Sequence, residues 1–157
     1  MIYLREQFKK IKFIDFENVK EEQGYGAPVT YEGLTYQNNE AAFQAQKCFN
    51  TKDREAFTNM NPTEAKKAGR KVLLRKDWEQ IKMSVMAGIV KAKFEQNEEL
   101  AKILLATGDA YLEEGNDWGD RIWGTVNGQG ANCLGMILMN TREELARERE
   151  RTTRKPK

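Results

Sequence analysis

Residues 77–96, DWEQIKMSVMAGIVKAKFEQ, form the longest stretch of helical periodicity in the chain. Apolar side chains recur in it at the three- and four-residue spacing that places them on one face of a helix. Asp77 directly precedes the pattern and is a residue type that caps helices. We therefore predict a core helix from Asp77 to about Gln96, with an apolar stripe of Trp78, Ile81, Val85, Ile89 and Ala92 that is widened by Met86, Val90 and Phe94.

Shorter patterns lie on both sides of this helix. IKFIDF (11–16) alternates weakly, and VTYEGLTY (29–36) predicts a β-hairpin that turns at Glu32-Gly33. Asn38 or Asn39 can cap a helix through NEAAFQAQKCF, and further helices are expected at 51–59, from Pro62 onward, and at 97–107. The last helix carries Leu134, Ile137, Leu138 and Leu145. Ala42, Phe43, Gln46 and Phe49 fall at helical spacing, and we expect Trp78, Met83, Met86, Met136 and Met139 to be core.

The predicted fold is an α+β, mainly α-helical single domain with a short N-terminal β-hairpin, spanning residues 1–147. A length of 157 residues fits one domain. After Leu145 the sequence ARERERTTRKPK is wholly polar, so residues 148–157 are expected to be a disordered tail. That tail is either a solvated end or a nucleic-acid-binding segment.

Composition excludes several kinds of chemistry. The chain has no histidine, which rules out His-based triads and His zinc sites, and two isolated cysteines cannot build a thiolate zinc site. We expect no metal and no cofactor, and reduced thiols. No apolar run approaches the roughly 20 residues that span a bilayer, and the charged start MIYLREQFKKIKF is unlike a signal peptide, so we expect a cytoplasmic protein without a membrane partner.

Residues 116–135, NDWGDRIWGTVNGQGANCLG, combine five glycines, two tryptophans and two aspartates with neither helical nor strand periodicity. Glycines let a backbone turn tightly or approach a ligand, and Trp118 and Trp123 offer flat surfaces on which a base or sugar can stack. The alternative is a glycine-rich turn whose indoles belong to the core. The combination favours a binding site.

A second candidate cluster lies on the predicted helix that begins near Asn39. Glu40 and Lys47 are seven residues apart, so we expect them two turns apart on one helical face. On a solvated face they would have no role. If they are partly buried, desolvation lowers a lysine pKa and raises that of a glutamate, which would prepare a nucleophilic amine and a general acid or base.

Several motifs occur in order along the chain: Glu40, the QAxK ending at Lys47, Gly69-Arg70, Asp77-Trp78, the DxxWG of Asp120 to Gly124, and the GxGxNxLG of Gly128 to Gly135. With these motifs the sequence resembles the NADAR family, also called YbiA-like N-glycosidases, over roughly residues 28–142. The family's usual FLSNF-like segment is replaced here by IDFENVKEEQGYG.

The resemblance implies cleavage of the C–N bond between a ribose and a base or amine. Substrates would be ribosylamino-pyrimidine phosphates of the riboflavin pathway or ADP-ribosylated guanine, free or in DNA or RNA. An ADP-ribose-binding module without catalysis is the main alternative, and a helical scaffold protein is a third. The implied catalytic residues are Glu40, Lys47 and Asp120; the implied substrate contacts are Trp123, Gly124, Asn127, Gly128, Gly130, Asn132, Trp78 and Arg70, the last being a phosphate contact or a surface ion pair.

Overall fold

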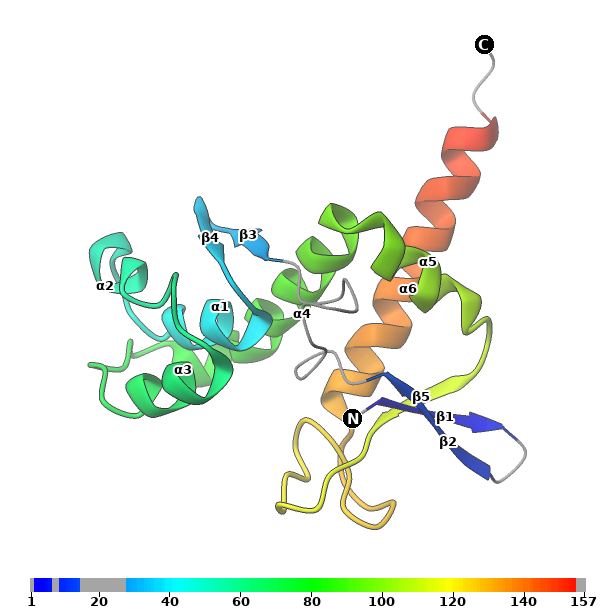
Figure 1. Cartoon of the computed structure of the whole chain (residues 1–157), viewed down its shortest axis with the longest axis horizontal. Helices are drawn as coiled ribbons and strands as arrows, with labels where there is room; N and C mark the ends of the chain where they lie inside the picture. The colour runs from blue at the N-terminus through cyan, green and yellow to red at the C-terminus, as the bar shows by residue number, and fades with distance from the viewer. Residues whose placement is uncertain (1, 7–8, 15–27, 155–157) are drawn as a thin grey trace. The chain divides into compact units, whose positions relative to one another are not determined.

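The computed structural model of the chain describes residues 2–6, 9–14 and 28–154 (Figure 1). They belong to two compact units, each described here by itself. The first unit comprises residues 1–16 and 97–157, and the second comprises residues 17–96. Both combine helices with a few short strands, so the predicted fold class, α+β and mainly helical, is confirmed.

The second unit begins with the predicted hairpin. Strands β3 (Val29–Tyr31) and β4 (Leu34–Tyr36) pair antiparallel. Glu32 and Gly33 between them have φ values of 49° and 81°, the left-handed conformation that a tight two-residue hairpin turn requires. Gly33 adopts it without steric cost, which explains why the turn falls at this dipeptide.

Three short helices of this unit begin at asparagines. Helices α1 (Asn39–Ala45), α2 (Thr51–Glu55) and α3 (Pro62–Gly69) are capped by Asn38, Asn50 and Asn61. In each case the asparagine side-chain oxygen accepts a hydrogen bond from the backbone N–H three residues later, at 2.8–2.9 Å. Such a cap satisfies one of the N–H groups that a helix start leaves without an internal partner.

Helix α4 (Trp78–Gln96) is the predicted core helix. Its buried residues include Trp78, Val85 and Ile89 from the predicted stripe. The hairpin packs on α4, where the Tyr31 ring lies against Gly88, and the Gln96 side chain exchanges two 2.8 Å hydrogen bonds with the backbone of Thr30. Helix α1 packs on both α3 and α4, which completes this unit (Figure 1).

The first unit contains a three-stranded antiparallel sheet and two helices. Strands β1 (Ile2–Glu6), β2 (Lys9–Ile14) and β5 (Tyr111–Glu114) lie in the order β2-β1-β5. Helix α5 (Glu98–Ala106) packs on α6 (Cys133–Arg154), which also lies against β5 (Figure 1). The sequence patterns predicted neither β1 nor β5.

Polar contacts fix α6 in this unit. The Arg142 guanidinium donates to the Ala110 carbonyl and to the Thr107 hydroxyl just after α5, at 2.9 and 2.8 Å. Arg149 forms an ion pair with Glu98 at the start of α5. The helix continues beyond its last buried leucine, Leu145, to Arg154.

Some of the predicted boundaries and burial were wrong. Helix α6 continues to Arg154, so residues 148–154 of the expected disordered tail are helical; residues 155–157 lie outside the described part of the chain. Met83 and Met136 were expected in the core but are 38% and 47% exposed. The weak IKFIDF pattern coincides with β2 as far as Ile14.

No helix among the described residues is both long enough and apolar enough to cross a membrane.

Candidate functional site

The predicted site residues fall into two groups, one in each unit. Glu40, Lys47, Arg70 and Trp78 belong to the second unit. Asp120 and the glycine-rich loop, residues 116–135, belong to the first. Each group has a defined local geometry, and the convergence of Asp120 with Glu40 and Lys47 stays a prediction.

Glu40 lies in the first turn of α1, but Lys47 lies beyond its end. The helix ends at Ala45, and the Lys47 N–H donates to the Gln44 carbonyl, three residues back, in the turn that follows. The prediction that both residues sit on one continuous helix was therefore wrong. Their charges still interact, because the Glu40 carboxylate favours the protonated form of the Lys47 amine.

The Lys47 amine is partly removed from water. Burial lowers its pKa below the ordinary value, the Glu40 carboxylate opposes this effect, and the Arg70 guanidinium adds to it. Its Nζ atom is 6.0 Å from the centre of the Trp78 ring, and that ring packs at 5.0 Å on the Phe43 ring. Trp78 is itself only 5% exposed, so its core role is confirmed and its indole forms part of the Lys47 environment.

Glu40 is held by its own helix. The Gln44 side-chain N–H donates to Glu40 Oε1 at 2.8 Å across one turn. Gln44 is 8% exposed and rests against Gly69, the glycine of the predicted Gly69-Arg70 motif. This unit therefore brings together a carboxylate, an amine with a lowered pKa and an aromatic ring.

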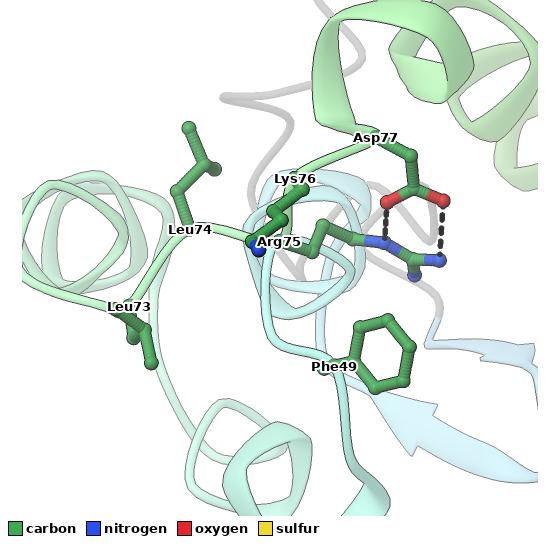
Figure 2. Close-up of a pocket in the computed structure, with 6 residues that line it drawn as sticks. All are labelled: Phe49, Leu73, Leu74, Arg75, Lys76 and Asp77. Atoms are coloured by element: carbon green, nitrogen blue, oxygen red, sulfur yellow. Dashed lines mark hydrogen bonds and ion pairs between the residues drawn. The ribbon is translucent and has the colours of Figure 1, made fainter.

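An open hollow lies beside the Lys47 turn. The Arg75 N–H donates to the Lys47 carbonyl at 3.0 Å, which fixes residues 73–77 next to that turn. The hollow has a volume of ≈ 500 Å³, and its six lining residues are Phe49, Leu73, Leu74, Arg75, Lys76 and Asp77 (Figure 2).

Arg75 organises this hollow. Its guanidinium forms two hydrogen bonds with Asp77, at 2.6 and 3.0 Å, and lies 5.2 Å from the centre of the Phe49 ring (Figure 2). The Asp77 side chain is thus engaged by Arg75 instead of capping α4, although the Asp77 carbonyl does accept from Gln80 and Ile81. This hollow was not predicted from the sequence. The sequence signal for it is KVLLRK, in which two leucines lie between basic residues.

In the glycine-rich loop, Asp120 organises a turn. Its Oδ1 accepts hydrogen bonds from the N–H groups of Ile122 and Trp123, at 3.0 and 2.9 Å. Asn116 in turn binds the backbone N–H and carbonyl of Asp120. Trp123 is half-buried, whereas Trp118 is 64% exposed. Asp120 Oδ2 accepts no hydrogen bond within the described part of the chain.

Close backbone approaches explain two of the loop glycines. A Cβ on Gly124 would lie 2.2 Å from the Glu114 carbonyl oxygen, and one on Gly130 would lie 2.4 Å from the Gly124 carbonyl oxygen. Asn127 and Gly128 have φ values of 53° and 77° and form a tight turn closed by hydrogen bonds between Val126 and Gln129. The Asn-Gly dipeptide is a sequence signal for such a turn.

Asn132 is a structural centre of the loop. It is 1% exposed and has a φ of 52°. Its Oδ1 accepts from the Glu114 N–H at 2.9 Å, while its Nδ2 donates to the Leu112 carbonyl at 2.9 Å and to the Tyr111 hydroxyl at 3.1 Å. The side chain predicted to contact substrate is therefore occupied in joining the loop to β5.

The described residues contain no group of three or more metal-ligating His, Cys, Asp or Glu side chains. Both cysteines, Cys48 and Cys133, are free thiols.

Fold and site define a mainly helical α+β protein with a carboxylate–lysine pair in one unit and an aspartate-organised glycine loop in the other. The sequence matches the NADAR domain model over residues 4–146. The chain belongs to the NADAR family.

Named relatives agree with this assignment. The chain is 43% identical over 126 residues to N-glycosidase YbiA of Shigella boydii serotype 4, with 78% of each chain covered. It is 38% identical over 125 residues to riboflavin biosynthesis protein VVA0006 of Vibrio vulnificus, covering 77% of this chain and 34% of that one. The NMR structure of E. coli YbiA superposes with a TM-score of 0.71 at 41% identity, covering 80% of this chain and 76% of that one.

These comparisons confirm the resemblance seen in the sequence. Relatives named N-glycosidases are hydrolases that act on N-glycosyl compounds, and the predicted enzyme class is confirmed at that level.

Proposed function

We propose that this protein hydrolyses the C–N bond between a phosphorylated or ADP-linked ribose and a base or amine. The observation that carries the proposal is the state of Lys47, whose partial burial lowers its pKa while Glu40 lies within electrostatic range. An amine of lowered pKa is a better nucleophile near neutral pH. The names of the N-glycosidase relatives support the same reaction class.

The chemistry needs two carboxylate functions and one amine. A carboxylate stabilises the oxocarbenium-like C1 as the C–N bond breaks, and an acid protonates the departing nitrogen. The Lys47 amine then bonds to C1 and loses a proton. The ring bond between C1 and O4′ breaks, O4′ takes up that proton, and an imine joins Lys47 to the opened ribose. Water adds to that imine, which releases the ribose aldehyde and restores the amine. The sum is one water consumed for one ribose and one base or amine released.

We propose two candidate substrates that contain such a ribose C–N bond. Support for a ribosylamino-pyrimidine phosphate comes from a relative named as a riboflavin biosynthesis protein, and ADP-ribosylated guanine, free or in DNA or RNA, is the second candidate. Arg70, whose charge reaches Lys47, is the proposed phosphate contact. For sugar and phosphate binding in the glycine-rich loop we propose Trp123, Gly124, Asn127, Gly128 and Gly130, with Asn132 holding the loop in shape. A cytoplasmic location stays a prediction.

A binding module without catalysis is the competing function. It is favoured by one observation: Oδ1 of Asp120 accepts two backbone hydrogen bonds, which is sufficient reason for an aspartate there without any reaction. Both functions require a ribose-binding surface, but only the enzyme requires Glu40 to act in the transition state.

Glu40→Gln separates the two functions. The substitution keeps an oxygen that can accept the Gln44 hydrogen bond and removes the charge. We expect kcat to fall roughly a hundredfold or more with little change in ligand affinity. Turnover would be measured on ADP-ribosylated DNA and on ribosylamino-pyrimidine phosphate, with released ribose identified by mass spectrometry, and affinity by calorimetry with ADP-ribose. Equal binding by both proteins with no hydrolysis by wild type would favour the binding module.

A further inference from the structure

Gln44 is a buried glutamine whose amide nitrogen is hydrogen-bonded and whose amide oxygen has no hydrogen-bond partner. Its Nε2 donates to Glu40 Oε1 at 2.8 Å. Its Oε1 is buried and has no hydrogen-bond partner, and the residue as a whole is 8% exposed. A buried acceptor without a partner costs free energy, so its retention needs a reason.

The chemistry of Glu40 explains which way the amide points. An ionised carboxylate can only accept hydrogen bonds, so the amide NH₂ must face Glu40 and the amide oxygen must face away. In that orientation the oxygen meets the backbone of α3 at Gly69. A Cβ on residue 69 would lie 1.9 Å from Gln44 Oε1 and 2.8 Å from Gln44 Cδ. Only glycine leaves room for this side chain at that position.

We propose that Gln44 is a positioning residue for Glu40 and that Gly69 is the notch that keeps the Gln44 amide in place. The proposal rests on the proposed function, because it assigns Gln44 a role through Glu40. Free to rotate, the Glu40 carboxylate would explore several conformers. The amide favours the conformer in which Oε1 accepts its hydrogen bond, at the expense of one unsatisfied oxygen, which is the kind of local cost found where geometry serves a reaction.

Gln46 provides a matched control on the same segment. It is also a buried glutamine, 2% exposed, two residues further along. Its amide donates to the Ala42 carbonyl at 3.2 Å and to the Tyr36 hydroxyl at 3.4 Å, and none of these partners has a proposed part in the reaction. Gln46→Ala removes a similar volume and similar hydrogen bonds without touching Glu40.

The test is a double-mutant cycle read in kcat. Gln44→Ala and Gly69→Ala should each lower kcat about tenfold or more with little change in KM, because a misplaced reacting group is costly even when binding persists. In the Gln44→Ala background, Gly69→Ala should have almost no further effect on kcat, since the two shortest contacts of the added methyl, with Gln44 Oε1 and Cδ, are then gone and the contact with the Cβ of residue 44, at 3.3 Å, remains. Gln46→Ala should lower the melting temperature and leave kcat unchanged.

The outcomes separate this inference from the function on which it rests. A wild-type protein that hydrolyses neither substrate overturns the proposed function. An active wild type with unchanged kcat in Gln44→Ala overturns the positioning role, and so does a Gln46→Ala variant that loses as much kcat as Gln44→Ala. Additive losses in the cycle overturn the coupling between Gly69 and Gln44. Circular dichroism at the assay temperature establishes that each variant is folded.

Discussion

Asn132 and Asn127 form a natural pair for testing what holds the glycine-rich loop together. Both are asparagines with left-handed backbone, at φ values of 52° and 53°. Asn132 is 1% exposed and makes three side-chain hydrogen bonds, whereas Asn127 is exposed and its side chain makes none within the described residues. Replacing each by alanine separates the shared backbone effect from the side-chain contacts.

The expected losses follow from these contacts. Alanine in the left-handed region costs about 1 kcal/mol at either position. At Asn132 the substitution also leaves the Glu114 N–H without its partner, which costs about 1–3 kcal/mol. It further removes the hydrogen bonds that Asn132 Nδ2 donates to the Leu112 carbonyl and the Tyr111 hydroxyl. We therefore expect Asn132→Ala to lower the free energy of unfolding by about 3–5 kcal/mol and Asn127→Ala by about 1 kcal/mol.

Urea denaturation followed by circular dichroism, together with thermal melts, measures both losses. For a chain of this length, 3–5 kcal/mol corresponds to a fall in melting temperature of roughly 6–20 °C. If Asn132→Ala does not fold while Asn127→Ala does, the difference in stability between the two variants has the predicted direction. Losses that agree within about 0.5 kcal/mol would refute the reasoning, because the buried hydrogen bonds would then contribute nothing to stability.

Three further outcomes are expected at the proposed site. Borohydride added during turnover should trap a sugar adduct on Lys47. Trapping should increase with pH through a midpoint below 10.5, because the lowered pKa makes the free amine available at lower pH. A Lys47→Ala variant of near-full activity, with no adduct in peptide maps of the wild type, would remove the nucleophile role. Trp123→Ala should weaken ligand binding roughly ten- to hundredfold with the fold intact, as calorimetry can measure; unfolding would show instead that the indole is core. Asp120→Asn should lower kcat roughly a hundredfold or more, since Oδ1 can still accept from Ile122 and Trp123 while the charge is lost; unchanged kcat would leave Asp120 a structural role only.

Local patterns predicted much of the second unit. The β3–β4 turn follows from Glu32-Gly33, the start of α3 follows from Asn61-Pro62, and the apolar stripe from Trp78 predicts α4. Each depends on neighbours within a few residues, so the information lies in the sequence itself. The end of α1 was predicted less well, because the helical spacing continues to Lys47 although the helix ends at Ala45.

The sheet of the first unit was not predictable in this way. Strand β1 pairs with β5 across more than a hundred residues, and neither strand alternates clearly enough to be recognised by itself. The helical extension to Arg154 was not predicted either, because the segment after Leu145 is wholly polar and offers no apolar periodicity. Exposure was misjudged at Met83 and Met136 for a related reason: an apolar residue type does not reveal whether another element covers it.

For the candidate site, the sequence by itself determined which residues are proposed to carry the chemistry: the Glu40–Lys47 pair, Asp120 and the glycine-rich loop. Tertiary structure decided the burial, the pKa shift and the hydrogen-bond partners of these side chains. Burial and the nearby Arg70 charge lower the Lys47 pKa, Gly69 leaves room for the Gln44 amide that donates to Glu40, and β5 binds the Asn132 side chain. Burial and hydrogen-bond partners come from residues far apart in the chain, so a residue's identity can be read locally, but its reactivity or structural role depends on the neighbours that folding supplies.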